Sequence, residues 1–173
     1  MRAKLRGAVS GHSSNAGPTR PGPSRWITPL IRSLRLKPHV EGGFFRETYR
    51  APGRICRATS ILFLLPAGSV SRLHRIKSDE IWFFHLGGPL VIVELDESLG
   101  RLRRTRLGPQ YCLQHTVKAG TWFGAYPEKA TKFSLVGCVV APGFDFKDFE
   151  LAQRKTLCRA FPRYRRLIER LTA

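Results

Sequence analysis

The feature that most constrains this chain is the run from Gly43 to Phe146, in which short β-branched and aromatic stretches alternate with turn residues. Gly and Pro mark the turns, because Gly adopts positive φ freely and Pro fixes φ. The pattern predicts nine strands, near residues 44–49, 57–65, 70–75, 79–86, 90–95, 101–107, 114–118, 121–126 and 131–140. Many short strands at this spacing predict an all-β fold, as a sandwich, a jelly roll or a barrel.

Helical patterns lie on both sides of the strands. Thr28 fits an N-cap, Pro29 fits the first turn, and Pro38 ends this N-terminal helix. After Asp148, "ELAQRKTLCRAF" and "YRRLIERLT" have the apolar spacing of C-terminal helices.

Residues 1–26 are expected to form a disordered basic leader, because they are rich in Gly, Ser, Pro and Arg and include no acidic residue. Residues 27–173 then make a single domain. The leader lacks the apolar core of a secretory signal and resembles an organelle transit peptide. An over-extended start codon would give the same composition. We therefore expect a cytoplasmic protein or, alternatively, one in an organelle such as a mitochondrion or plastid.

The formal net charge of +18 is concentrated in three clusters. Residues 1–40 hold eight Lys or Arg, residues 101–106 hold four Arg, and residues 154–170 hold seven basic side chains. Such charge favours anionic partners. The aromatic residues, however, lie within apolar strands and are not interleaved with the basic ones, as single-strand nucleic-acid platforms require. Nucleic-acid binding is therefore expected to be absent or non-specific.

Apolar runs and cysteines limit the remaining classes. No apolar run approaches the roughly 20 residues that span a bilayer, so no membrane partner is expected. The four cysteines lack metal-site spacing and are expected as free thiols in a reducing compartment; they are Cys56, Cys112, Cys138 and Cys158.

The stretch "GSVSRLHRIKSDEIWFFHLGG", which begins at Gly68, resembles the first motif of the cupins. That motif has Gly, five residues, His, one residue, His, three or four residues, Glu, six residues and Gly. Gly68, His74, Glu80 and Gly87 occupy four of its five positions, and Ile76 stands in place of the second His. The resemblance implies a cupin-type double-stranded β-helix, a jelly-roll barrel, between the N-terminal and C-terminal helices.

One branch of the cupins is more similar still, the family of unassigned activity sometimes called cupin group five. Five stretches carry this resemblance, in order over residues 39–153: "HVEGGFFRETYR", "ATSILFLLPAG", "HRIKSDEIW", "KAGTWFGA" and "VGCVVAPGFDFKDFELA". The resemblance to cupins also implies a homodimer.

The second cupin motif bears on a metal site. Its centre is Pro-x-Gly-x-x-His, and here Lys118 replaces the Pro and Phe123 replaces the His. A cupin metal site uses three imidazoles and a carboxylate, a set that suits a divalent transition metal. With Ile76 and Phe123 at two ligand positions, only His74 and Glu80 are left to hold a metal, so we expect none to be tightly bound.

A metal-free pocket inside the barrel is the interpretation that we favour. His74 and Glu80 are its candidate catalytic residues, because burial and a neighbouring charge poise an acid and a base. The candidate ligand-binding residues are aromatic, since flat apolar surfaces stack on rings; they are Trp82, Phe84, Trp122 and Phe123. The alternative is that His74 and Glu80 only hydrogen-bond to each other within a packed barrel.

The other histidines are expected outside the site. Strand alternation places His85 on the face opposite Glu80. His39 and His115 have no partners at ligand spacing, so solvent exposure is expected for both.

Three further groups have structural interpretations. Asp79 is expected to bind backbone amides in a polar turn. Arg46 is expected to pair with a carboxylate at a dimer contact, although its planar fork also suits an acidic ligand. The segment "APGFDFKDFE" is expected to close one end of the barrel, or to form a lid over the pocket.

The sequence thus predicts a cupin-fold protein with a small-molecule pocket, for which a carbohydrate-like ligand is one expectation. Binding alone and catalysis both remain open. The alternatives are a metal-dependent cupin enzyme, isomerase/epimerase-like or dioxygenase-like, and a basic nucleic-acid-associated protein.

Overall fold

The computed structural model describes residues 27–173, and the strands predicted from the sequence are present in it. The expectations for residues 1–26 lie outside this range. The strands are β1 Lys37–Pro38, β2 Phe44–Arg50, β3 Thr59–Pro66, β4 Ser71–Ile76, β5 Asp79–Gly87, β6 Leu90–Asp96, β7 Arg101–Leu107, β8 Gln114–Val117, β9 Trp122–Pro127, β10 Phe133–Ala141 and β11 Phe149–Leu151.

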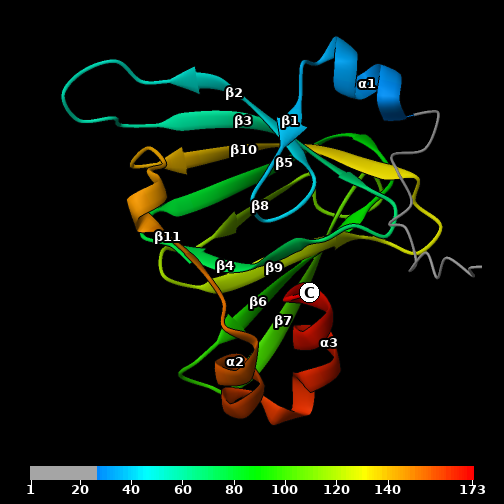
Figure 1. The fold of residues 1–173 in the computed structure, drawn as a ribbon, viewed down its shortest axis with the longest axis vertical. Helices are drawn as coiled ribbons and strands as arrows, with labels where there is room; N and C mark the ends of the chain where they lie inside the picture. The colour runs from blue at the N-terminus through cyan, green and yellow to red at the C-terminus, as the bar shows by residue number, and fades with distance from the viewer. Residues whose placement is uncertain (1–26) are drawn as a thin grey trace, which may run out of the picture.

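The strands form two facing antiparallel sheets (Figure 1). One has the order β1-β2-β3-β10-β5-β8 and the other the order β11-β4-β9-β6-β7. Alternate residues of each strand point between the sheets, as the period of two requires. The enclosed core contains Phe63, Leu65, Ile76, Trp82, Leu90, Ile92, Leu107, Val117, Phe123, Ala125, Val136, Cys138 and Val140. The fold is the expected all-β jelly roll.

Helices cover the outer faces of the sheets. They are α1 Ile27–Ser33, α2 Arg154–Ala160 and α3 Arg165–Leu171, with the 3-10 turns η1 Phe146–Asp148 and η2 Pro162–Tyr164. The first helix packs its apolar side on Leu64 and Leu135 of the six-stranded sheet. The helices α2 and α3 cover the five-stranded sheet, below β6 and β7 in Figure 1. None of the helices in residues 27–173 is long and apolar enough to cross a membrane.

The short strand β11 differs from the sequence prediction, which placed helix directly after Asp148. Its three residues pair with β4 instead. Phe149 packs against the core, whereas Glu150 is exposed and its carboxylate lies 2.8 Å from the guanidinium of Arg75. This alternation over three residues is too short to be recognised as a strand from the sequence.

An ion-pair cluster joins the two sheets at the edge formed by β7 and β8. Glu94 Oε2 lies 2.8 Å from His115 Nε2 and 3.0 Å from Arg103 Nη2. Burial raises the pKa of Glu94, but the hydrogen bonds and charges of His115 and Arg103 outweigh it, and the pKa lies below its ordinary value. The expectation that His115 is solvent-exposed is wrong, because its side chain is 13% exposed and bridges the sheets.

The turn before β2 brings the chain unusually close to its neighbours. Gly42 and Gly43 have φ of +110° and +66°, a region that only Gly enters without strain. A Cβ on Gly42 would lie 2.2 Å from the carbonyl oxygen of Val70. The main chain of Glu41 is fixed there as well, since its carbonyl accepts the N–H of Arg72 at 2.8 Å.

We predict that Gly42→Ala destabilises the protein by about 3 kcal/mol or more, because the new Cβ meets both an unfavourable φ and a carbonyl oxygen. Gly53→Ala is the matched control. Gly53 has a similar φ of +115°, but a Cβ there would have no atom nearer than 4.0 Å. Gly53→Ala therefore measures the cost of the unfavourable φ alone, about 1 kcal/mol. Urea unfolding of both variants measures the difference, and equal losses would contradict the close approach.

Candidate functional site

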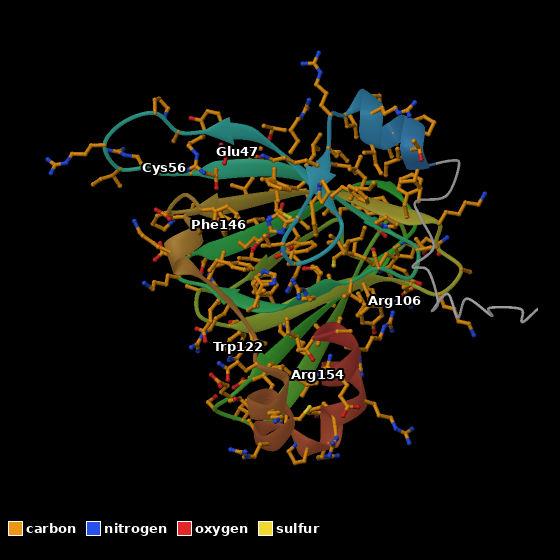
Figure 2. All side chains as sticks on the ribbon, in the orientation of Figure 1. Glu47, Cys56, Arg106, Trp122, Phe146 and Arg154 are labelled. Carbon is orange, nitrogen blue, oxygen red and sulfur yellow. The ribbon has the colours of Figure 1, made fainter. Side chains whose placement is uncertain are left out.

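A cavity opens inside the barrel, lined by β2, β3, β5 and β10 of one sheet and by β4 and β11 of the other. The empty space in and around it is about 600 Å³, a volume that includes open solvent outside the mouth. Glu47 and Phe146 lie at the end of the barrel where it opens (Figure 2). The lining residues are His39, Glu41, Phe45, Glu47, Arg50, Thr59, Ile61, His74, Ile76, Glu80, Cys138, Val140, Phe144, Phe146 and Phe149.

Glu41 is buried in this cavity and held from β4. Ser71 Oγ donates to its Oε1 at 3.0 Å, and His74 Nε2 lies 3.2 Å from its Oε2. Only 6% of the residue is exposed. The side chain and the main chain of Glu41 are therefore both tied to the strand that carries His74.

The contacts of His74 fix its tautomer. Its Nδ1 lies 2.7 Å from the carbonyl oxygen of Arg72, and because a carbonyl only accepts, Nδ1 carries a proton. The contact between Nε2 and Glu41 then needs one further proton, on the imidazole or on the carboxyl. Burial lowers the pKa of His74 and raises the pKa of Glu41 to about 7. These directions favour a neutral imidazole beside a protonated Glu41.

His39 faces the cavity from the segment before β2. Its side chain is 8% exposed, and its ring contacts Phe45 edge to face at 4.5 Å. Burial lowers the pKa of His39, and Nδ1 of the neutral ring accepts the N–H of Glu41 at 3.4 Å. The expectation that His39 is exposed is wrong. Within the described chain the Nε2–H of His39 has no hydrogen-bond acceptor, so this donor is unused.

Glu80 is the least satisfied acid of the site. The residue is 7% exposed, and within residues 27–173 its hydrogen-bonding contact is the thiol of Cys138, a weak donor. Burial raises the pKa of Glu80 to about 7, with the charge of His74 lowering it and that of Glu41 raising it. Burial beside Glu80 also raises the pKa of Cys138 well above its ordinary value, so this thiol stays protonated. Glu80 can therefore hold or release a proton near neutrality.

Aromatic rings and one ion pair form the mouth. Phe144 and Phe146 contact edge to face at 5.1 Å, and Phe149 lies within 6.3 Å of both. Arg50 donates to Glu47 at 2.7 Å and to the carbonyl of Phe144 at 3.2 Å. The segment after β10, expected as a closing element or a lid, thus forms one wall of the cavity.

The described residues around His74 do not fit the ligand set of a cupin metal site. Ile76 lines the cavity, and the ring of Phe123 packs 4.1 Å from that of His74, so two cupin ligand positions are apolar. Both nitrogens of His74 are already engaged by Arg72 and Glu41. Among residues 27–173, no three His, Cys, Asp or Glu side chains are arranged to hold a metal ion.

The predicted site residues divide into two groups. His74 and Glu80 line the cavity. The four predicted aromatic residues are not among its lining. Trp82 and Phe123 are fully buried in the core, with ring centroids 6.4 Å apart, and Phe84 packs against the same core. Trp122 lies on the opposite face of its sheet, in the cluster between the sheet and the helices α2 and α3 (Figure 2).

Two other residues lie where the sequence placed them. His85 is exposed on the outer face of β5. Asp79 binds a backbone amide, as expected, but that amide belongs to Ala119, at 2.9 Å, and Lys118 adds an ion pair at 2.8 Å. Asp79 therefore ties β5 to the turn before β9.

Sequence reasoning missed the two polar residues nearest His74, which are His39 and Glu41. The residues of "HVEGG" do not form an extended segment: they fold into a turn, in which the N–H of Gly42 donates to the carbonyl of His39 at 3.1 Å. The double Gly that ends this stretch indicated a close approach of the backbone. What the sequence lacked was the packing of this segment against β4.

The all-β jelly roll with flanking helices is consistent with the cupin class of proteins. The family described as "Cupin superfamily (DUF985)" matches residues 28–152, and the chain belongs to this family. No curated protein matches the sequence.

Solved structures agree with this assignment. Protein SO0799 from Shewanella oneidensis is 37% identical, with a TM-score of 0.78 over 84% of this chain and 96% of that one. A hypothetical protein from Leishmania major is 30% identical, with a TM-score of 0.72 over 87% and 98% of the two chains. Oxalate decarboxylase from Bacillus subtilis is 16% identical with a TM-score of 0.55, over 78% of this chain and 36% of that one, and shows likeness of fold alone.

We predict that the stability of the protein falls as the pH rises from 6.5 to 8. A carboxyl with a pKa raised by folding, from 4.5 to about 7, binds more protons when folded, so its stabilisation is lost as the pH rises through about 7. Folding lowers the pKa values of His39 and His74, so these two groups make the stability rise with pH, but only below about pH 6.5. Above 6.5 the loss should be roughly 1 kcal/mol for each carboxyl.

Urea unfolding of Glu80→Gln at pH 6.5 and pH 8 tests whether these carboxyls cause the fall. The variant lacks one of the two carboxyls, so its stability should fall less between the two pH values than that of the parent. Glu97→Gln, in the exposed turn after β6, is the matched control and should lose as much stability as the parent. A parent with constant or rising stability over this interval would contradict the raised pKa values.

Proposed function

We propose that this protein binds a small molecule in the cavity between its sheets, with Glu80 as the acid–base group that meets the ligand. The observation that carries the proposal is the burial of the Glu80 carboxyl in a cavity wall, with a thiol as its hydrogen-bonding contact. A buried carboxyl normally has better donors than a thiol. A ligand in the cavity would supply them.

His74 has a positioning role in this proposal. Its ring nitrogens are held by Arg72 and Glu41, so it fixes Glu41 in place and has no free nitrogen with which to reach the ligand. The mixture of apolar walls with a few convergent polar groups is typical of small-molecule sites. A ring with hydroxyl groups, such as a carbohydrate, fits donors and acceptors of this kind. Proton transfer by Glu80 is the reaction that the site would support.

The proposed site works without a metal. Support comes from Ile76 and Phe123 at two of the cupin ligand positions and from the engagement of both nitrogens of His74. A metal-dependent isomerase-like or dioxygenase-like enzyme would need donors at those positions.

We further propose a homodimer. Arg46, on the face of β2 opposite Glu47, has a buried Nε without a hydrogen-bond partner in the described chain. Because this Nε is shielded within one copy, a carboxylate from a second copy would pair with the outer nitrogens of the same guanidinium. Nucleic-acid binding through the basic clusters, where present, is proposed to be non-specific and salt-dependent.

A metabolite panel screened by thermal shift tests the pocket. A ligand at about 100 times its Kd adds roughly 2.7 kcal/mol, which raises the Tm of a chain this size by roughly 5–10 °C. Glu80→Gln should lose this response and keep a Tm near that of the parent, because the amide is isosteric with the carboxyl.

Glu97→Gln, outside the cavity, should respond as the parent does. His74→Ala is unsuitable as the main test, because it removes the partner of the buried Glu41. Elemental analysis of the same samples checks the metal proposal, which predicts well under one equivalent of transition metal. A parent that no compound stabilises, or a response that survives Glu80→Gln, would contradict the pocket.

A further inference from the structure

Charge distinguishes the ligands that this cavity can accept. Among the described residues, Arg50 is the one cation of the cavity lining. The ionisable lining residues are His39, Glu41, Glu47, Arg50, His74, Glu80 and Cys138. Burial keeps the two imidazoles neutral by lowering their pKa values. The ionised forms available in the cavity are therefore mainly carboxylates.

Arg50, the one cation among the described lining residues, already has partners. Arg50 Nε and Nη2 donate to the two carboxylate oxygens of Glu47 at 3.0 and 2.7 Å, and Nη1 donates to the carbonyl of Phe144 at 3.2 Å. Arg72, which lies near Glu41, donates to the carbonyl of Val40 and is not part of the lining. An anionic ligand would thus meet the carboxyl of Glu80 with no free positive charge among the described lining residues to pair with it.

A cationic ligand would find an acceptor in the cavity, the carboxyl of Glu80. Glu80 is more than nine-tenths buried, faces the cavity and has a thiol as its hydrogen-bonding contact. A charged N–H group is the strongest donor that it can receive. The rings of Phe144, Phe146 and Phe149 at the mouth add attraction, because the negative face of an aromatic ring favours a cation.

We infer that the cavity takes a small ring-shaped ligand bearing a basic nitrogen, which binds as a cation with that nitrogen against Glu80. This inference rests on the proposed function and narrows its ligand class. The neutral Nε2–H of His39 adds a donor, so an acceptor atom elsewhere on the ligand fits as well. Glu41 is held by Ser71 and His74 and supplies a second carboxyl behind the site. An amino sugar or a nitrogen heterocycle has the required chemistry, whereas a sugar acid or a phosphate ester does not.

Three probes of the same shape and different charge test this class: benzylamine, benzyl alcohol and benzoate, each titrated into the full-length protein labelled with ¹⁵N at neutral pH. Benzylamine should shift the resonances of cavity residues and bind at least about tenfold more tightly than benzyl alcohol, a ratio typical of one charge-assisted hydrogen bond. Benzoate should leave these resonances unchanged. Glu80→Gln should reduce the affinity for benzylamine to that for benzyl alcohol, and Glu97→Gln should change neither.

The outcomes separate this inference from the proposed function. If benzyl alcohol or benzoate binds in the cavity as tightly as benzylamine, the pocket stands and the cationic class is wrong. The class is also wrong if the preference for benzylamine survives Glu80→Gln. If none of the three probes shifts a cavity resonance, the inference is overturned and the pocket itself loses support.

Discussion

The contact between Glu41 and His74 organises the interior of this barrel. A carboxyl and an imidazole are both costly to bury, and each is stable here because the other is present. Ser71 and the carbonyl of Arg72 satisfy the remaining polar atoms of the pair. The pair exists only because Gly42 and Gly43 let the chain pass close to Val70 and Leu64, which places Glu41 opposite β4. A local backbone requirement thus determines the chemistry of the cavity.

The same pair determines what Glu80 can do. With Ile76 and Phe123 beside it, His74 turns toward Glu41, and Glu80 is left facing the cavity without a strong donor. Burial then raises the pKa of Glu80 to about 7, where a carboxyl is useful as either an acid or a base. Ile76 and Phe123 are apolar where the cupin motifs have His, and Glu80 lies near them as a buried carboxyl in the cavity wall.

The sequence predicted the fold well, because strand alternation and turn residues are local signals. It also identified His74 and Glu80 as lining residues through the spacing of one motif. It could not identify Glu41 and His39, because their burial depends on how the segment before β2 packs against β4. The aromatic residues predicted to bind a ligand do not line the cavity, for two different reasons. Trp122 and Phe123 are adjacent in one strand and so lie on opposite faces, and Trp82 points inward but is packed between Phe63 and Phe123.

The protonation state of His74 tests this account most directly. Ring ¹⁵N chemical shifts, assigned by comparison with a His74→Gln variant, distinguish the two neutral tautomers and the imidazolium. At neutral pH we expect His74 to be neutral with its proton on Nδ1, donated to the carbonyl of Arg72, while Glu41 holds the shared proton. A neutral ring protonated on Nε2, with Nδ1 bare, would contradict it.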